Sequence, residues 1–193
     1  MLNKKQASLI LRVNRKENPS YLIQIRDNVE NAKFKFPGVL SLFGGEVDDF
    51  ETGKEGFLRE MYEEIKGINF ESVKLEHRVY DWKKDLERVG NEINGAVKNN
   101  FNVFRGFNYD DFIPGEALGK DRDKKTTFRD LFYAVKEDHY FVGETDQIGD
   151  LDIHEGKGII LPEQICRTAI LYPTDKIALM HDYVMRKKSG EEC

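Results

Sequence analysis

The amino-acid sequence predicts an α/β or α+β fold in which helices pack on a sheet. Apolar runs with strand-type composition stand before, between and after segments with helical spacing, and this succession favours a layered sandwich over a helical bundle. A chain of 193 residues is long enough to bury the core of one domain. We find no internal repeat and no low-complexity segment, and therefore expect a single domain over residues 1–193.

The first predicted elements are strands. Residues 7–13 and 20–26 are β-type runs, and the turn-like stretch NRKENP between them favours a hairpin. The apolar and aromatic stretch at 34–45 predicts a third strand, which we expect to end in a tight turn at Gly44-Gly45.

A helix is predicted to follow from about Lys54 to Lys66. Thr52 stands where an N-cap belongs, and Glu55 follows three residues later, which is the spacing of a capping box. Phe57 and Met61 recur on one side of this helix, so we expect that side to pack on the sheet.

The rest of the chain continues the alternation of strands and helices. We predict strands at 73–82, 101–107, 127–135 and 157–161, helices at 83–99 and 173–188, and loops at 108–126 and 143–156. Pro162 is well placed as the first residue of a helical turn.

Charge and cysteine content exclude several classes of protein. The net charge of −5 argues against binding along a nucleic-acid backbone, which normally requires a basic surface. A small phosphorylated ligand remains compatible with this charge, because a bound divalent cation reverses the local sign. Cys166 and Cys193 are the only cysteines and lack metal-type spacing, so we expect neither a disulfide framework nor a zinc site.

Targeting and membrane signals are not evident. The first residues, MLNKKQASLILRVNR, contain only a short apolar run that Arg12 interrupts. No stretch approaches the roughly 18 apolar residues of a membrane span. We therefore expect a cytoplasmic protein without membrane association.

The predicted helix at 54–66 carries an unusual group of acids. At about 100° per residue, Glu60, Glu63 and Glu64 project within an arc of about 100°. Each like-charge pair at this spacing costs a few tenths of a kcal/mol. Three carboxylates above a Gly-Gly turn form an oxygen-rich site suited to a hard cation such as Mg²⁺ or Mn²⁺. From composition alone, a solvated surface helix in a Glu-rich protein is the favoured interpretation.

The order of residues separates the two interpretations, because the stretch resembles the Nudix box. That motif is a Gly, five residues, a Glu, seven residues, Arg-Glu, an apolar residue, any residue, Glu-Glu, any residue, and Gly before an apolar residue. The matching positions in this chain are Gly45, Glu51, Arg59, Glu60, Met61, Glu63 and Glu64. The resemblance implies a Nudix-type α/β/α sandwich with a mixed β-sheet.

The resemblance also implies roles for these residues. Glu60, Glu63 and Glu64 would be metal ligands for Mg²⁺ or Mn²⁺, and Gly45 would offer its carbonyl oxygen. Arg59 and Glu51 would form the ion pair that holds the loop against the helix. Two positions depart from the motif: Lys66 stands where the last Gly belongs, with Gly67 one residue late, and Phe43 stands where Pro is frequent. The late glycine suggests a slightly longer helix or a shifted cap.

A second segment, residues 128–165 with its acidic loop, is similar to the later part of Nudix domains. On that match Glu155 could be an additional metal ligand or the general base for water, although an exposed loop glutamate is an equally good interpretation. Glu144, Asp146 and Asp150 are rivals for the same role. His154 is interpreted as a loop residue and not as a ligand.

The resemblance implies metal-dependent hydrolysis of a pyrophosphate bond in a nucleoside diphosphate derivative. The candidates are a nucleoside triphosphate, ADP-ribose, a nucleotide sugar and a dinucleoside polyphosphate. The alternative is a Nudix-fold regulatory module that senses a nucleotide without turnover. Residues 83–126 are atypical of the family and are treated as an insertion in which substrate choice could be built. Whether the chain forms a homodimer is left open by the sequence.

Overall fold

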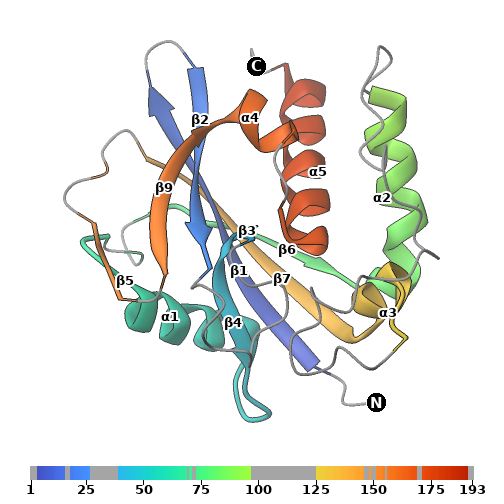
Figure 1. Cartoon of the computed structure of the whole chain (residues 1–193), viewed down its shortest axis with the longest axis horizontal. Coiled ribbons are helices and arrows are strands. Elements are labelled where there is room, and N and C mark those ends of the chain that lie inside the picture. The colour runs from blue at the N-terminus through green and yellow to red at the C-terminus, as the bar shows by residue number, and fades with distance from the viewer. Residues whose placement is uncertain are drawn as a thin grey trace.

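The computed structural model describes residues 4–15, 18–26, 39–68, 70, 73–96, 125–145, 148, 151–154, 156–168 and 171–190. The strands are β1 (Lys4–Arg15), β2 (Asn18–Ile25), β3 (Leu40–Ser41), β4 (Phe43–Val47), β5 (Ile65–Lys66), β6 (Glu76–Tyr80), β7 (Val135–Thr145), β8 (Asp152–Ile153) and β9 (Lys157–Pro162). The helices are α1 (Gly53–Glu64), α2 (Trp82–Ala96), α3 (Phe128–Tyr133), α4 (Glu163–Thr168) and α5 (Pro173–Ser189). Figure 1 shows α1 on one side of the sheet and α2 and α5 on the other.

Strand β1 is the centre of the sheet. It runs parallel to β7 and antiparallel to β2 and β4, and β6 and β9 extend the sheet beyond β7 and β2. The two antiparallel neighbours use different parts of β1, because β4 pairs with residues 5–9 and β2 with residues 12–15. The sheet is therefore mixed, as predicted. The strands β2 and β4 pair with different segments of β1.

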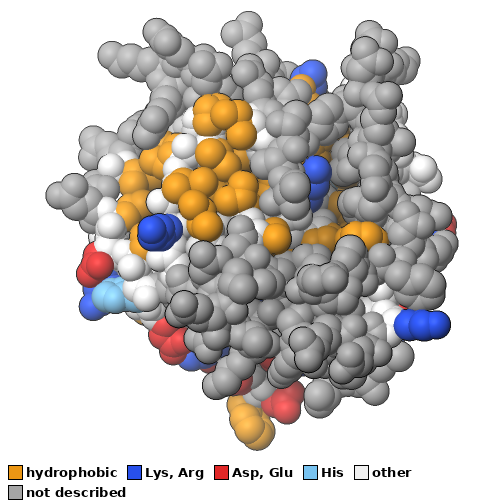
Figure 2. Space-filling model, viewed as in Figure 1, with side chains coloured by type: hydrophobic (Ala, Val, Ile, Leu, Met, Phe, Trp, Pro, Cys, Tyr) orange, Lys and Arg blue, Asp and Glu red, His pale blue; other side chains and the backbone are white. Residues whose placement is uncertain are grey.

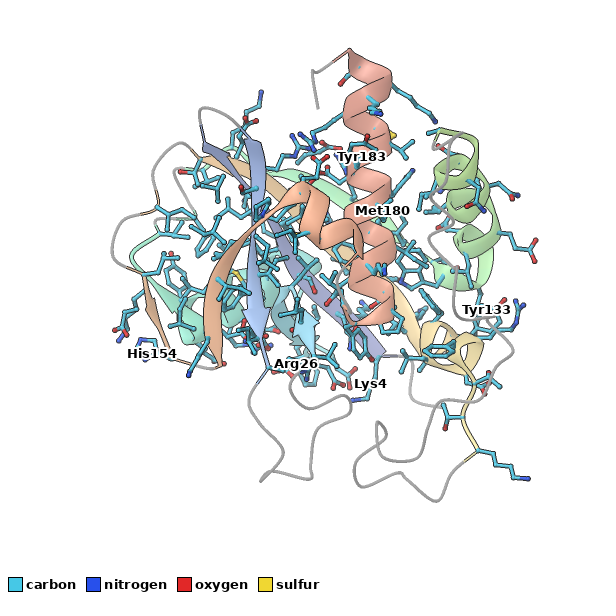
Figure 3. All side chains as sticks on the ribbon, turned by 45° about the horizontal axis from the view of Figure 1, so that its top comes forward. Lys4, Arg26, Tyr133, His154, Met180 and Tyr183 are labelled. Carbon is cyan, nitrogen blue, oxygen red and sulfur yellow. The ribbon has the colours of Figure 1, made fainter. Side chains whose placement is uncertain are left out.

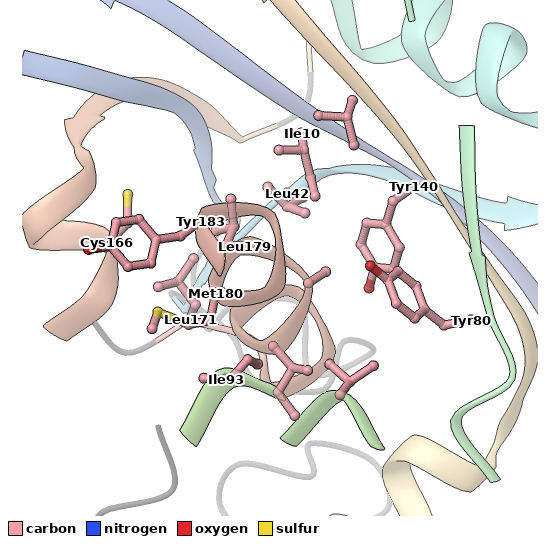
Figure 4. Close-up of a cluster of buried hydrophobic side chains, with 14 of the residues drawn as sticks. Ile10, Leu42, Tyr80, Ile93, Tyr140, Cys166, Leu171, Leu179, Met180 and Tyr183 are labelled. Carbon is pink, nitrogen blue, oxygen red and sulfur yellow. The ribbon is translucent and has the colours of Figure 1, made fainter. Parts of the chain in front are cut away.

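The two faces of the sheet bury separate apolar clusters. Leu9 and Leu11 of β1 pack with Phe57 and Met61 of α1, whereas Ile10 packs with α5 on the opposite face. This alternation follows from the period of two along a strand. Figure 4 shows the second cluster, in which Ile10 and Leu42 lie on the side of Leu179 of α5, while Met180 lies near Leu171. The predicted α/β/α sandwich is confirmed.

A buried ionic network anchors α5 to the sheet. Asp182 is fully buried and accepts hydrogen bonds from Arg12 at 2.7 and 3.0 Å, from Arg78 at 2.9 Å and from the Tyr21 hydroxyl at 2.9 Å. The neighbouring guanidinium groups hold the pKa of Asp182 below its usual value although burial opposes this shift. Both carboxylate oxygens are thus paired, which a buried charge requires.

The predicted strand at 127–135 is wrong. Phe128–Tyr133 form α3, because Thr127 and Asp130 make a reciprocal capping box at its start. The strand is β7, which begins at Val135 and takes in the first residues of the predicted loop at 143–156. The alternation of buried and exposed positions that identifies a half-buried strand is missing in β7, since it lies between β1 and β6 and buries residues 138–143 continuously.

Smaller corrections concern the ends of elements. The tight turn expected at Gly44-Gly45 is wrong, because both glycines lie inside β4 and pair with Ser8 and Ala7. Pro162 is the last residue of β9, and α4 begins one residue later. The expected strand at 101–107 and most of the 83–126 segment, from 97 to 124, lie outside the described residues.

One surface is rich in apolar side chains. Figure 2 shows them gathered in the area that β9 and α4 occupy in Figure 1, where Ile165 is 49% exposed and Ile159 and Leu161 are partly buried. Among the described residues, no helix is both long and apolar enough to cross a bilayer. The homodimer and the cytoplasmic location stay predictions.

Candidate active site

Helix α1 holds the acidic residues over β4. Its start is fixed as predicted, because the Thr52 side chain accepts the Glu55 N–H and the Glu55 carboxylate accepts the Thr52 N–H. Phe57 and Met61 are fully buried against the sheet. With this face buried, the register of α1 carries Glu60 and Glu64 to the edge of β4.

Helix α1 ends at Glu64, two residues before the predicted end. Ile65 and Lys66 form the short strand β5, which pairs with β8, and Gly67 has a positive φ of 100°. The suggestion of a longer helix is therefore wrong. The late glycine serves the turn after β5, where a left-handed backbone favours Gly.

Arg59 joins the loop before α1 to the acidic face of the helix. Its guanidinium donates to both carboxylate oxygens of Glu51, at 2.8 and 2.9 Å, and to the carbonyl of Glu46 at 2.8 Å. A third nitrogen donates to Glu60 Oε1 at 2.6 Å. The bonds from Arg59 to Glu51, with one from the Asp48 N–H, lower the pKa of Glu51 to about 2. A bidentate ion pair of this kind fixes the orientation of the two side chains in addition to pairing their charges.

Glu60 lies against the backbone of Gly45. A Cβ atom built on Gly45 would be 2.3 Å from Glu60 Oε2, closer than any real contact. The absence of a side chain at residue 45 therefore makes room for the Glu60 carboxylate. The backbone itself does not demand glycine there, since the φ of Gly45 is not in the left-handed region.

Glu64 is buried and held at both oxygens. Oε2 accepts the N–H of Gly44 at 2.8 Å, and Oε1 lies 3.4 Å from the amide nitrogen of Gln24. The Gln24 amide oxygen in turn accepts the Ser41 hydroxyl at 3.1 Å. The side chains of Gln24 and Ser41 come from β2 and β3, so Glu64 connects those strands to β4.

Gly44 also has a strict conformational requirement. Its φ is 141°, and a Cβ there would lie 2.1 Å from the carbonyl oxygen of Ala7. The two glycines thus serve different purposes: Gly44 allows the strand backbone to approach β1, and Gly45 makes room for Glu60.

Glu63 differs from its two neighbours. Its side chain is 62% exposed, and its carboxylate lies 3.8 Å from the Arg59 guanidinium. The structure therefore brings Glu60 and Glu64 to consecutive residues of β4 and leaves Glu63 at the surface beside them.

The donor set fits a hard divalent cation. Among the described residues no three His, Cys, Asp or Glu side chains form a ready-made metal cluster. Mg²⁺ does not need one, because it is commonly bound through one or two carboxylates, with waters and substrate phosphates completing its coordination. Carboxylate oxygens beside the Gly44–Gly45 backbone match that preference.

The loop that carries the other predicted site residues is only partly described. Glu155, Asp146 and Asp150 lie outside the described residues, whereas Glu144 lies in β7, with its carboxylate 3.9 Å from Arg12. The N–H of His154, the residue before Glu155, donates to the carbonyl of Glu64 at 2.9 Å. The chain thus passes the end of α1 immediately before Glu155.

Comparison with solved structures identifies the fold. A mutT/nudix family protein from Listeria innocua superimposes with a TM-score of 0.55 at 15% identity, over 98% of both chains. An Ap4A hydrolase from C. elegans gives 0.53 at 12% identity, over 95% of this chain and 98% of that one.

The chain has a Nudix fold. A bifunctional NMN adenylyltransferase/ADP ribose pyrophosphatase from Francisella tularensis, complexed with AMP and a Mn ion, gives a TM-score of 0.50 at 14% identity, over 96% of this chain and 42% of that one. No family model and no curated protein sequence matches this chain.

Proposed function

We propose that the chain is a metal-dependent Nudix hydrolase that cleaves a pyrophosphate bond in a nucleoside diphosphate derivative. The observation that carries this proposal is the placement of Glu60 and Glu64 on the consecutive glycines of β4. Like charges brought together at a backbone that excludes side chains repel one another, and a divalent cation bound between them would offset that repulsion.

The cation would be Mg²⁺ or Mn²⁺, with Glu60, Glu63, Glu64 and the carbonyl of Gly45 as its ligands. When bound, such an ion supplies positive charge that neutralises the diphosphate, and it activates a water molecule at neutral pH. The Mn ion in the Francisella tularensis structure supports this choice of metal.

The chain itself positions these groups. Arg59 holds the loop through Glu51 and also fixes Glu60, while Gly44 and Gln24 hold Glu64. Preorganised charge of this kind is the main contribution of a protein to phosphoryl transfer. Glu155 is proposed as the general base or an additional ligand, since the chain passes Glu64 one residue earlier.

The activities named for the structural neighbours guide the choice of candidate substrates. The neighbours include an Ap4A hydrolase and an enzyme with an ADP ribose pyrophosphatase activity. For this chain, we propose a nucleoside triphosphate, ADP-ribose, a nucleotide sugar or a dinucleoside polyphosphate.

A panel assay tests the proposal. The protein is incubated with these compounds in Mg²⁺ or Mn²⁺, and the products are separated by chromatography. We expect cleavage at a pyrophosphate bond for one class of compound and no cleavage in EDTA. Full activity in EDTA would contradict the metal site. Tight nucleotide binding without turnover across the panel would favour the alternative, a regulatory module that senses a nucleotide.

A further inference from the structure

Two histidines from neighbouring strands meet on the face of the sheet that α1 covers. His77 lies in β6 and is paired with Phe141 of β7, and His139 stands two residues before Phe141 on the same strand. The two histidines are therefore diagonal neighbours on one face of the sheet. His77 Nε2 lies 2.9 Å from His139 Nδ1, so the two rings share a hydrogen bond.

Aromatic packing fixes the orientation of these imidazole rings. His77 stacks on Phe141 with the ring centres 4.4 Å apart, and Phe141 stacks in turn on Phe57 of α1 at 4.2 Å. His139 is only 7% exposed, whereas His77 is open to solvent. One imidazole is thus held inside the fold, and the other lies where an ion can arrive from solution.

Both imidazoles are neutral at pH 7. Loss of solvation lowers the pKa of His77 from its ordinary value. Burial, and after it the neighbouring His77, lowers the pKa of His139, and Glu137 opposes that shift. A neutral imidazole has a lone pair on one of its two nitrogens, and this is the form that binds a metal ion.

Glu137 lies beside the second nitrogen of His139. Its Oε2 is 3.6 Å from His139 Nε2, which is buried and makes no hydrogen bond within the described part of the chain. A carboxylate here favours the tautomer that carries its proton on Nε2, which leaves the lone pair of Nδ1 facing His77. Metal-binding histidines almost always have such a partner on the other nitrogen. Lys5 lies 3.8 Å from Glu137, so the charges of these two side chains offset each other.

The spacing of the two facing nitrogens suits a transition-metal ion. Imidazole nitrogens bind such ions at about 2.0 Å, so two adjacent nitrogens are roughly 2.8 Å apart on a square-planar ion. The observed separation is 2.9 Å, with the rings within 15° of parallel. A tilt of the exposed His77 ring would point both lone pairs at one ion. The described residues offer no group of three His, Cys, Asp or Glu ligands, so water would complete the coordination.

This pair is separate from the acidic face of α1. A Cβ built on Gly53, the first residue of α1, would lie 2.4 Å from His139 Nδ1. Since a helix rises by about 1.5 Å per residue, Gly53 is about 10 Å from Glu60 along α1. The histidine pair therefore adjoins the start of the helix, and the acidic residues follow two turns later.

We propose that His77 and His139 form a second metal site that takes a transition-metal ion with a preference for nitrogen ligands. Imidazole suits Cu²⁺, Ni²⁺ and Zn²⁺, whereas Mg²⁺ and Mn²⁺ favour oxygen. Cu²⁺ binds most tightly, in line with the general order of affinities among divalent ions. On binding, the proton that His77 Nε2 donates moves to His77 Nδ1, so both imidazoles stay neutral and both facing nitrogens bind the ion.

Copper paramagnetic resonance tests this site without any turnover. One equivalent of Cu²⁺ is added to the metal-free full chain in excess Mg²⁺, and we expect hyperfine splitting from two imidazole nitrogens. His77→Phe keeps a flat ring against Phe141 and removes one of the two ligands. The two-nitrogen pattern should be lost, and the Cu²⁺ affinity should fall by more than about tenfold, the loss typical of a supporting partner alone.

His154→Phe is the matched control. His154 is an exposed histidine that follows β8, and Figure 3 shows it at the edge of the molecule. This variant should keep the wild-type Cu²⁺ spectrum and affinity. Identical spectra and affinities for His77→Phe and the wild type would overturn the site, and so would loss of the two-nitrogen pattern in His154→Phe.

Glu137→Ala tests the supporting carboxylate. The Glu137 side chain is partly exposed, so we expect the variant to fold. It should keep the two-nitrogen pattern and bind Cu²⁺ about tenfold more weakly, because outer partners of this kind orient the ligand. An unchanged Cu²⁺ affinity would overturn the role of Glu137. None of these results depends on hydrolysis, so failure of the proposed function and failure of this site are distinguishable.

Discussion

The carboxylate of Glu60 occupies the space that a side chain on Gly45 would need: a Cβ at residue 45 would lie 2.3 Å from Glu60 Oε2. Gly45→Ala should therefore displace Glu60 without breaking the strand, since the displaced group is the end of a flexible side chain. We expect a folded protein with weakened Mn²⁺ binding and reduced hydrolysis, measured by paramagnetic resonance titration and by the panel assay.

The matched control for this change is Gly95→Ala. Gly95 is exposed near the end of α2, and a Cβ there would meet nothing within 4 Å. The control should raise the free energy of unfolding by up to about 1 kcal/mol, the difference in helix propensity, and leave Mn²⁺ affinity unchanged. Equal Mn²⁺ affinities in the two variants would contradict the role assigned to the contact between Gly45 and Glu60.

Arg59→Lys should loosen the loop before α1. A lysine cannot reproduce two parallel bonds to Glu51 while also reaching the Glu46 carbonyl. We expect faster amide hydrogen exchange at residues 46–51 and slower hydrolysis. Arg88→Lys is the control, because Arg88 also pairs with two acids but lies on the exposed side of α2. If both variants exchange like the wild type, the loop does not depend on Arg59.

Gln24→Leu should weaken the metal site from outside it. The amide of Gln24 is buried and lies beside Glu64 Oε1 at 3.4 Å, so its loss removes one contact that positions the carboxylate. Loss of such a supporting bond typically costs about 10- to 100-fold in metal affinity. Gln6→Leu, the same substitution on the neighbouring strand, should leave Mn²⁺ affinity without nucleotide unchanged. Identical Mn²⁺ titrations for the two variants would show that Gln24 does not position Glu64.

Asp138 should make the fold less stable as the pH rises. Burial raises its pKa from 3.8 to about 7, while hydrogen bonds from Trp82 and Tyr140 oppose the shift. Between about pH 4 and pH 7 the folded state therefore holds a proton that the unfolded state has lost, so the free energy of unfolding falls across that window. Asp175 acts in the same direction up to about pH 6.

Asp138→Asn removes the larger of these two contributions. Its amide oxygen can still accept from Trp82 and Tyr140, so the core should keep its packing. We expect the fall in melting temperature between pH 5 and pH 8 to be smaller in the variant than in the wild type. An identical pH profile for the two proteins would mean that Asp138 is ionised in the fold throughout.

Local features of the fold could be predicted from the sequence. The start of α1 depends on Thr52 and Glu55, three residues apart, and the spacing of Glu51, Arg59 and Glu60 is set by one loop and one helix. The capping box is encoded within four residues, so its spacing alone identifies it, whereas the pairing of Arg59 with Glu51 was implied by the motif resemblance. The motif resemblance added the expectation of a Nudix-type α/β/α order of layers, which the structure bears out.

Contacts between distant residues could not be predicted in this way. Gln24 and Glu64 are 40 positions apart, and nothing in the composition of either stretch indicates the other. His77 and His139 likewise lie 2.9 Å apart, nitrogen to nitrogen, only because β6 and β7 pair. The wrong prediction of a strand at 127–135 has a different cause. The aromatic residues of this segment favour a strand, but the capping box at Thr127 starts helix α3 there.

The most direct test of the central claim compares Glu64→Gln with Glu87→Gln in the hydrolysis assay. Glu64 is buried beside Gly44, whereas Glu87 is an exposed glutamate of α2. With the best substrate of the panel and Mg²⁺, we predict that Glu64→Gln loses more than about tenfold in rate and that Glu87→Gln keeps the wild-type rate. Wild-type hydrolysis by a folded Glu64→Gln protein would contradict the proposed metal site.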